Sequence, residues 1–116
     1  MKNKKDLILA IKEYANREKN WDGYDGIAPT PLAIEEAIYF LDLMNIEQKL
    51  PEVCAAGDGE ICFFWKNEKL YLELGFYGKD YYSYIFISEN PDVLIDDISL
   101  KSDKIPSKLI TYIDLF

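Results

Sequence analysis

Residues 51–88 read PEVCAAGDGEICFFWKNEKLYLELGFYGKDYYSYIFIS. Apolar and polar side chains alternate through much of this stretch, and pairs rich in glycine, asparagine and aspartate interrupt the alternation at short intervals. A period of two is typical of half-buried strands, and such pairs are typical of hairpin turns. The pattern therefore predicts an antiparallel meander of four strands over residues 52–57, 60–66, 69–77 and 80–88.

The turns also fix the register, because residues that face each other across an antiparallel pair share one side of the sheet. Two-residue turns at Asp58-Gly59, Asn67-Glu68 and Gly78-Lys79 place apolar side chains on one side. We expect this side to be the core, and it consists of Ile61, Phe63, Trp65, Leu70, Leu72, Leu74, Ile85 and Ile87.

The other side of the predicted sheet is aromatic. A solvent-facing sheet surface normally carries polar side chains, whereas tyrosine is favoured where proteins recognise one another. Two interpretations are open: this side is a binding or self-association surface, or a helix of the same chain covers it. The side carries Phe64, Tyr71, Tyr77, Tyr82, Tyr84 and Phe86, together with Cys62 and Glu73.

The two cysteines lie on either side of the first turn. A two-residue turn at Asp58-Gly59 pairs Cys54 with Phe63, so that Cys54 and Cys62 point to opposite sides of the sheet. We therefore expect two free thiols. A three-residue loop would instead bring the two cysteines face to face, and a disulfide could then be considered.

Helical periodicity surrounds the meander. Apolar residues recur at helical spacing over residues 5–18, and Thr30-Pro31 supplies an N-cap hydroxyl and an N1 proline for a second helix. Residues 93–98 suit a fifth, edge strand or an irregular segment, and Pro106 begins a last short helix. We predict a single α+β domain, residues 1–116, with two N-terminal helices, a four-stranded antiparallel meander and a short C-terminal helix.

Composition narrows the classes of function. Thirteen basic and 21 acidic residues give a net charge of −8, which disfavours binding to nucleic acid. The absence of histidine removes every Ser-His-Asp or Cys-His arrangement and every histidine-containing metal site. Neither a phosphate-binding loop, a signal peptide nor a membrane-spanning run is present, so we expect a cytoplasmic protein without a cofactor.

A second notable stretch precedes the second helix. Trp21, Asp22, Gly23 and Tyr24 combine a large aromatic plug with turn-forming residues, which predicts a structural clasp between the first helix and the sheet. The chemical alternative is a cation site with Asp22 and Asp25 as oxygen ligands, although the run lacks the ligand alternation of a calcium loop.

The order of these motifs resembles a group of small, uncharacterised bacterial proteins. The similarity covers about residues 20–75 and rests on the Trp21–Tyr24 run, a proline soon after it, an alanine-rich helix, the Asp58-Gly59-Glu60 turn and an aromatic strand that ends at Trp65. The resemblance implies a compact α+β fold and supplies no activity.

Three functions are therefore compatible with the sequence. The first is a non-enzymatic, acidic protein-binding module that neutralises or inhibits a partner with a basic surface, as antitoxins, immunity proteins and phage anti-defence proteins do by analogy. The second is a homo-oligomer, such as a homodimer, whose interface is the tyrosine-rich side. The third is a small enzyme, which would need a deep pocket holding at least two of Asp22, Asp25, Glu73 and Tyr84.

Overall fold

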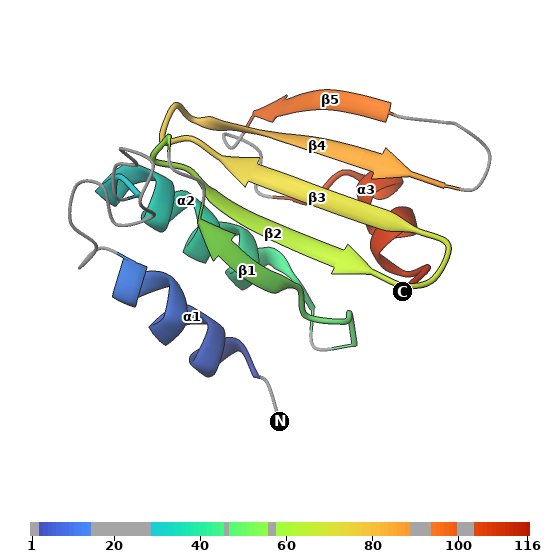
Figure 1. The fold of residues 1–116 in the computed structure, drawn as a ribbon, viewed down its shortest axis with the longest axis horizontal. Helices are drawn as coiled ribbons and strands as arrows, with labels where there is room; N and C mark the ends of the chain where they lie inside the picture. Colours follow the sequence, from blue (N-terminus) through green and yellow to red (C-terminus); the bar gives the residue numbers. More distant parts are fainter. Residues whose placement is uncertain (1–2, 15–28, 46, 56–57, 89–93, 100–103) are drawn as a thin grey trace.

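One antiparallel sheet organises the molecule (Figure 1). The computed structural model describes residues 3–14, 29–45, 47–55, 58–88 and 104–116, and the backbone of residues 94–99. The strands lie side by side in chain order, so the α+β meander is confirmed and β5 extends it at the edge. They are β1 (Glu52–Ala55), β2 (Ile61–Lys66), β3 (Tyr71–Phe76), β4 (Tyr81–Ile87) and β5 (Leu94–Ser99).

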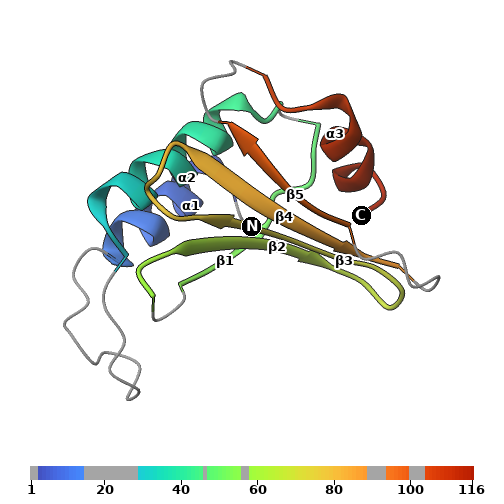
Figure 2. The same cartoon turned by 90° about the horizontal axis from the view of Figure 1, so that it is seen from above.

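The three helices lie on the same side of this sheet (Figure 2). They are α1 (Lys4–Glu13), α2 (Pro31–Leu43) and α3 (Ser107–Ile113). The predicted cap of α2 is confirmed, because the Thr30 hydroxyl accepts the backbone N–H of Ala33 at 3.1 Å and Pro31 begins the helix. The face of the sheet under the helices is called the inner face below, and the opposite one the outer face.

The core lies between the inner face and the helices. Phe40 of α2 is fully buried at its centre, and its ring centroid lies 5.3–6.1 Å from those of Phe63, Phe76 and Tyr82. At the other end of β4, Tyr112 of α3 stacks on Phe86 with the ring centroids 4.1 Å apart. The inner face therefore buries aromatic rings from β4 under two different helices.

The predicted register of β4 against β3 was wrong by one residue. Phe76 pairs with Tyr82, so the chain turns at residues 78–80 and not through a two-residue Gly78-Lys79 turn. An additional residue in a turn exchanges the two faces of the strand that follows it. Tyr82, Tyr84 and Phe86 are consequently buried on the inner face, while Ile85 and Ile87 lie on the outer face.

The β2–β3 turn also differs from the prediction, but without exchanging faces. The side chain of Asn67 accepts the backbone N–H groups of Lys69 and Leu70 at 3.0 and 2.8 Å, which makes Asn67 the first residue of the turn. Trp65 therefore pairs with Leu72 and not with Leu70. A register shift of two residues preserves the alternation, so Phe63, Trp65 and Leu72 are buried as expected.

Candidate functional site

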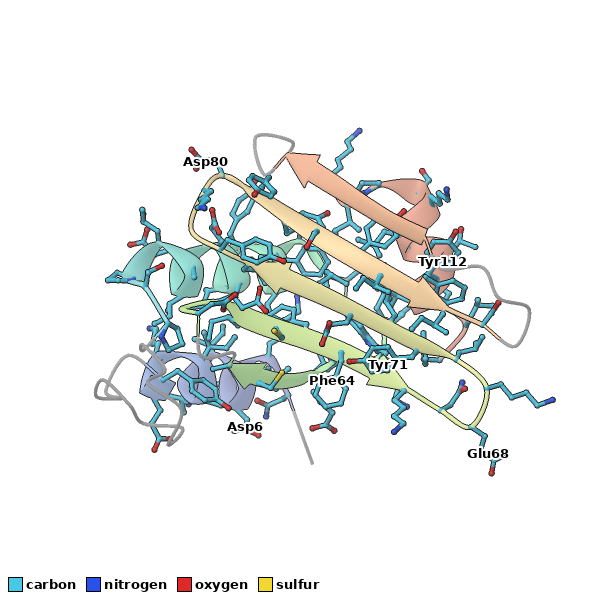
Figure 3. All side chains as sticks on the ribbon, turned by 45° about the horizontal axis from the view of Figure 1, so that its top comes forward. Asp6, Phe64, Glu68, Tyr71, Asp80 and Tyr112 are labelled. Atoms are coloured by element: carbon cyan, nitrogen blue, oxygen red, sulfur yellow. The ribbon has the colours of Figure 1, made fainter. Side chains whose placement is uncertain are left out.

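The outer face of the sheet is the candidate site. Within the described residues, no helix packs on this face, and in Figure 3 the helices appear behind the strands. The outer face carries three of the six aromatic residues predicted for it: Phe64, Tyr71 and Tyr77. Tyr82, Tyr84 and Phe86 belong to the core. The corrected register places Tyr81, Ile85 and Ile87 on the outer face in their stead.

Phe64 and Tyr71 form the aromatic end of the outer face (Figure 3). Glu73 lies on the same face, paired with Phe64. The rings of Phe64 and Tyr71 lie at 27° to each other with their centroids 6.3 Å apart. The Tyr71 hydroxyl donates to Oε1 of Glu73 at 3.0 Å. Burial and this carboxylate acceptor raise the pKa of Tyr71 to about 12, so the phenol stays a neutral hydrogen-bond donor at ordinary pH.

A polar cluster occupies the middle of the outer face, over Gly75. A Cβ atom at Gly75 would lie 2.9 Å from the Tyr77 hydroxyl and 3.0 Å from Oε2 of Glu60, so the missing side chain provides the space for both groups. The Tyr77 hydroxyl also lies 2.8 Å from the hydroxyl of Ser83. Burial is the main cause that raises the pKa of Glu60.

The cysteine pair, Cys54 and Cys62, adjoins this cluster. The expectation that these thiols point to opposite faces was wrong: Cys54 pairs directly with Cys62. Ala55 pairs with Ile61, so an odd number of residues separates the two paired positions. An odd number is what the alternative with a three-residue loop required, and it brings the two cysteines face to face. Both thiols are free, and Sγ of Cys62 donates to Oε1 of Glu60 at 3.2 Å.

The described charge on the outer face is mainly negative. Its carboxylates are Glu52, Glu60 and Glu73, against one ammonium group, that of Lys66. Together with the chain's net charge of −8, this gives an aromatic and acidic surface. Such a surface is electrostatically complementary to a basic one.

The sequence also predicts a structural clasp, an alternative cation site and, for the enzymatic hypothesis, a pocket. The clasp formed by Trp21, Asp22, Gly23 and Tyr24 lies outside the described residues, as does the alternative ligand Asp25. Glu73 and Tyr84 lie on opposite faces of the sheet, so the pocket required for the enzymatic hypothesis does not include both. In the described part of the chain, no group of three or more cysteine or acidic residues is arranged to hold a metal ion.

Comparisons with known proteins add no relative. No family model, no curated protein and no solved structure matches the chain. The resemblance based on Trp21–Tyr24 and the Asp58-Gly59 turn therefore stays a prediction. None of the helices in the described ranges has the length and apolar character needed to cross a membrane.

Sequence reasoning missed several outer-face residues, namely Cys54, Glu60, Gly75, Tyr81, Ser83, Ile85 and Ile87. For Tyr81, Ser83, Ile85 and Ile87 the reason is that the turn at residues 78–80 has one residue more than predicted. Glu36 of α2 accepts two backbone N–H groups of this turn. For Gly75 a signal was present, since an isolated glycine within a strand pattern often marks a close approach by another group.

Proposed function

We propose that the protein is a non-enzymatic binding module whose outer sheet face docks a protein partner with a basic surface. The observation that carries this proposal is the one-sided placement of α1, α2 and α3, all on the inner face. The outer face presents Phe64, Tyr71, Tyr77, Tyr81, Ile85 and Ile87, of which Ile87 is 40% exposed and the others are half-buried.

The residue types on this face support a protein partner. Tyrosine offers a large contact area with few rotamers and a polar tip, so it loses little entropy when it is fixed in an interface. The hydroxyl groups of Tyr71 and Tyr77 already have polar neighbours on the protein, at Glu73 and Ser83. These bonds hold both rings against the sheet, and a preorganised surface loses less entropy on binding.

The carboxylates on the outer face support a basic partner. Glu52 is exposed beside the aromatic residues, and Glu60 and Glu73 are partly exposed. Opposite charges across an interface raise the association rate and weaken with added salt. A nuclease or another nucleic-acid-binding protein would offer such a surface, and neutralising it is the role that we propose.

Site-specific photocrosslinking in the native cell tests this proposal. One photoreactive phenylalanine analogue replaces Tyr71 on the outer face, and another replaces Tyr39, which is 39% exposed on the helical side of the molecule. We expect a discrete adduct with a basic protein at the Tyr71 position and not at the Tyr39 position. Mass spectrometry of the adduct identifies the partner, and its yield reports the binding.

Charge reversal provides the matched control. Glu52→Lys on the outer face should reduce the adduct several-fold, whereas Glu35→Lys, at an exposed position of α2, should leave it unchanged. Equal yields at Tyr71 and Tyr39, or equal effects of the two reversals, contradict docking at the outer face. An adduct of twice the chain mass would instead identify the alternative, a homo-oligomer joined through this face.

A further inference from the structure

The register of β1 and β2 places two thiols directly opposite each other. Cys54 and Cys62 are paired residues of neighbouring antiparallel strands and share the outer face. The Cα atoms of such pairs are about 4.5–5.5 Å apart. That separation falls inside the range that disulfide bonds span, about 4.4–6.8 Å. The backbone already has the spacing that a bridge between these two residues requires.

The two thiols differ in access and acidity. Cys54 is half-buried on the edge strand β1, whereas Cys62 is only 5% exposed on β2. The adjacent side chain of Cys62 lowers the pKa of Cys54. The adjacent Cys54, burial and the hydrogen bond to Glu60 raise the pKa of Cys62. Cys54 is therefore the thiol suited to attack an external reagent, and Cys62 the one suited to react second.

Glu60 supplies an acceptor for the proton of the second thiol. Oε1 of Glu60 accepts the S–H of Cys62 at 3.2 Å. Oε2 of Glu60 occupies the space beside Gly75, which has no side chain. Burial raises the pKa of this carboxyl above that of an ordinary glutamate, which makes it a better proton acceptor. A buried thiol with an adjacent carboxylate can lose its proton as its sulfur forms a new bond.

We propose that Cys54 and Cys62 are a reversible dithiol–disulfide pair that exchanges with low-molecular-weight disulfides, with Glu60 as the proton acceptor for Cys62. The proposal does not depend on the binding function above.

In the first step, Cys54 loses its proton to water, and its thiolate attacks the disulfide RSSR, forms a mixed disulfide and expels RS⁻, which takes a proton from water. In the second, the Cys62 sulfur attacks the Cys54 sulfur, its proton passes to Glu60, and a second RS⁻ leaves. Glu60 then gives this proton to the departing RS⁻, which restores the carboxylate. The protein loses two electrons and two protons, and RSSR becomes two RSH.

Oxidised glutathione is the probe for the test, with intact mass spectrometry as the readout. The reduced wild-type chain should lose the mass of two hydrogen atoms and both titratable thiols, and dithiothreitol should restore them. Cys62→Ser should stop at a chain carrying one glutathionyl group on Cys54. Cys54→Ser, which leaves only the buried thiol, should react with glutathione disulfide at least about tenfold more slowly.

The matched control moves one thiol along the same strand. The double variant Glu52→Cys/Cys54→Ser keeps two thiols on the outer face of β1 and β2, but in diagonal positions, where Cα atoms are about 7–8 Å apart. This variant should not form an internal bridge. Closure of the control at the wild-type rate overturns the proposal, as does a wild-type chain that stays reduced or stops at the mixed disulfide.

Glu60→Gln separates proton transfer from simple positioning. Glutamine keeps an oxygen that can accept the S–H bond but cannot take the proton. The mixed disulfide should therefore accumulate, and its closure should slow by about tenfold or more at neutral pH. The wild-type closure rate should fall as Glu60 is protonated at acid pH, and the variant should lose this pH dependence. An unchanged rate and pH profile contradict the role of Glu60.

Discussion

Glu36 on α2 accepts the backbone N–H of Gly78, 42 residues further along the chain, at 2.6 Å. Its second carboxylate oxygen accepts the N–H of Asp80 at 2.7 Å. One helix side chain therefore holds both ends of the turn between β3 and β4. Because this turn determines which face of β4 is buried, the contact connects α2 to the composition of both sheet faces.

Removing this carboxylate should destabilise the fold. Glu36→Ala leaves two backbone N–H groups without their charged acceptor, and we expect a loss of about 1–3 kcal/mol in the free energy of unfolding. Glu35→Ala is the control, because Glu35 is exposed on the same helix; its effect should be within about 0.5 kcal/mol. Urea denaturation measures both. Similar losses for the two variants would show that the turn does not depend on Glu36.

Gly78 should not tolerate a side chain. Its φ is +80°, and a Cβ atom would lie 2.9 Å from Oγ1 of Thr30 and 3.2 Å from the backbone N of Ala33. We expect Gly78→Ala to cost at least about 1–2 kcal/mol, from the left-handed backbone and the close contact with α2. Asp80 has a φ of 66°, so Asp80→Gly should change stability by less than about 1 kcal/mol. Thermal unfolding distinguishes the two, and a neutral Gly78→Ala contradicts this account.

Local signals were sufficient for the elements and insufficient for the registers of β1–β2 and β3–β4, each of which differs from the prediction by one residue. Alternating hydrophobicity locates β2, β3 and β4, and Thr30-Pro31 locates the start of α2. The Asn67 turn was misplaced by one position without consequence, because a register shift of two residues keeps every side chain on its face. The Gly78 turn was not so tolerant, because one additional residue exchanges the faces of β4. Its backbone N–H groups donate to Glu36, which no local pattern connects to it.

The sequence predicted that one face of the sheet is aromatic, but it identified only some of the residues on that face. An aromatic face with Phe64, Tyr71 and Tyr77 follows from the sequence, because β2 and β3 keep their predicted faces. Whether a helix covers this face did not follow from the sequence. β4 could not be assigned, since its two faces are both rich in apolar and aromatic residues. The sequence pattern therefore did not show that Tyr82 and Tyr84 belong to the core, where both are buried.

Burial of Tyr84 predicts a large penalty for its truncation. Tyr84 and Trp65 are each 2% exposed on the inner face, so both Tyr84→Ala and Trp65→Ala should cost roughly 3–5 kcal/mol. Tyr71 is half-buried on the outer face, and Tyr71→Ala should cost clearly less. Chemical denaturation of the three variants tests the register of β4. A small effect of Tyr84→Ala together with a large effect of Tyr71→Ala would reverse the assignment of faces.

Stability at alkaline pH should depend on Tyr71. Its pKa is about 12 in the folded protein against 10.0 for the reference phenol, because burial and Glu73 disfavour the phenolate. The unfolded chain therefore loses this proton first, and the stability that the neutral phenol contributes decreases as pH rises from about 10 to about 12. Tyr71→Phe removes this titration.

The stability difference between wild type and Tyr71→Phe should therefore shrink over the same pH range and stay constant below it. Urea denaturation at a series of pH values measures the difference. A Tyr81→Phe variant serves as the control for the loss of a hydroxyl elsewhere on the outer face, since its hydroxyl is not the one that donates to Glu73. A difference that is flat through the alkaline range would show that the Tyr71 phenol is not held in its neutral form by the fold.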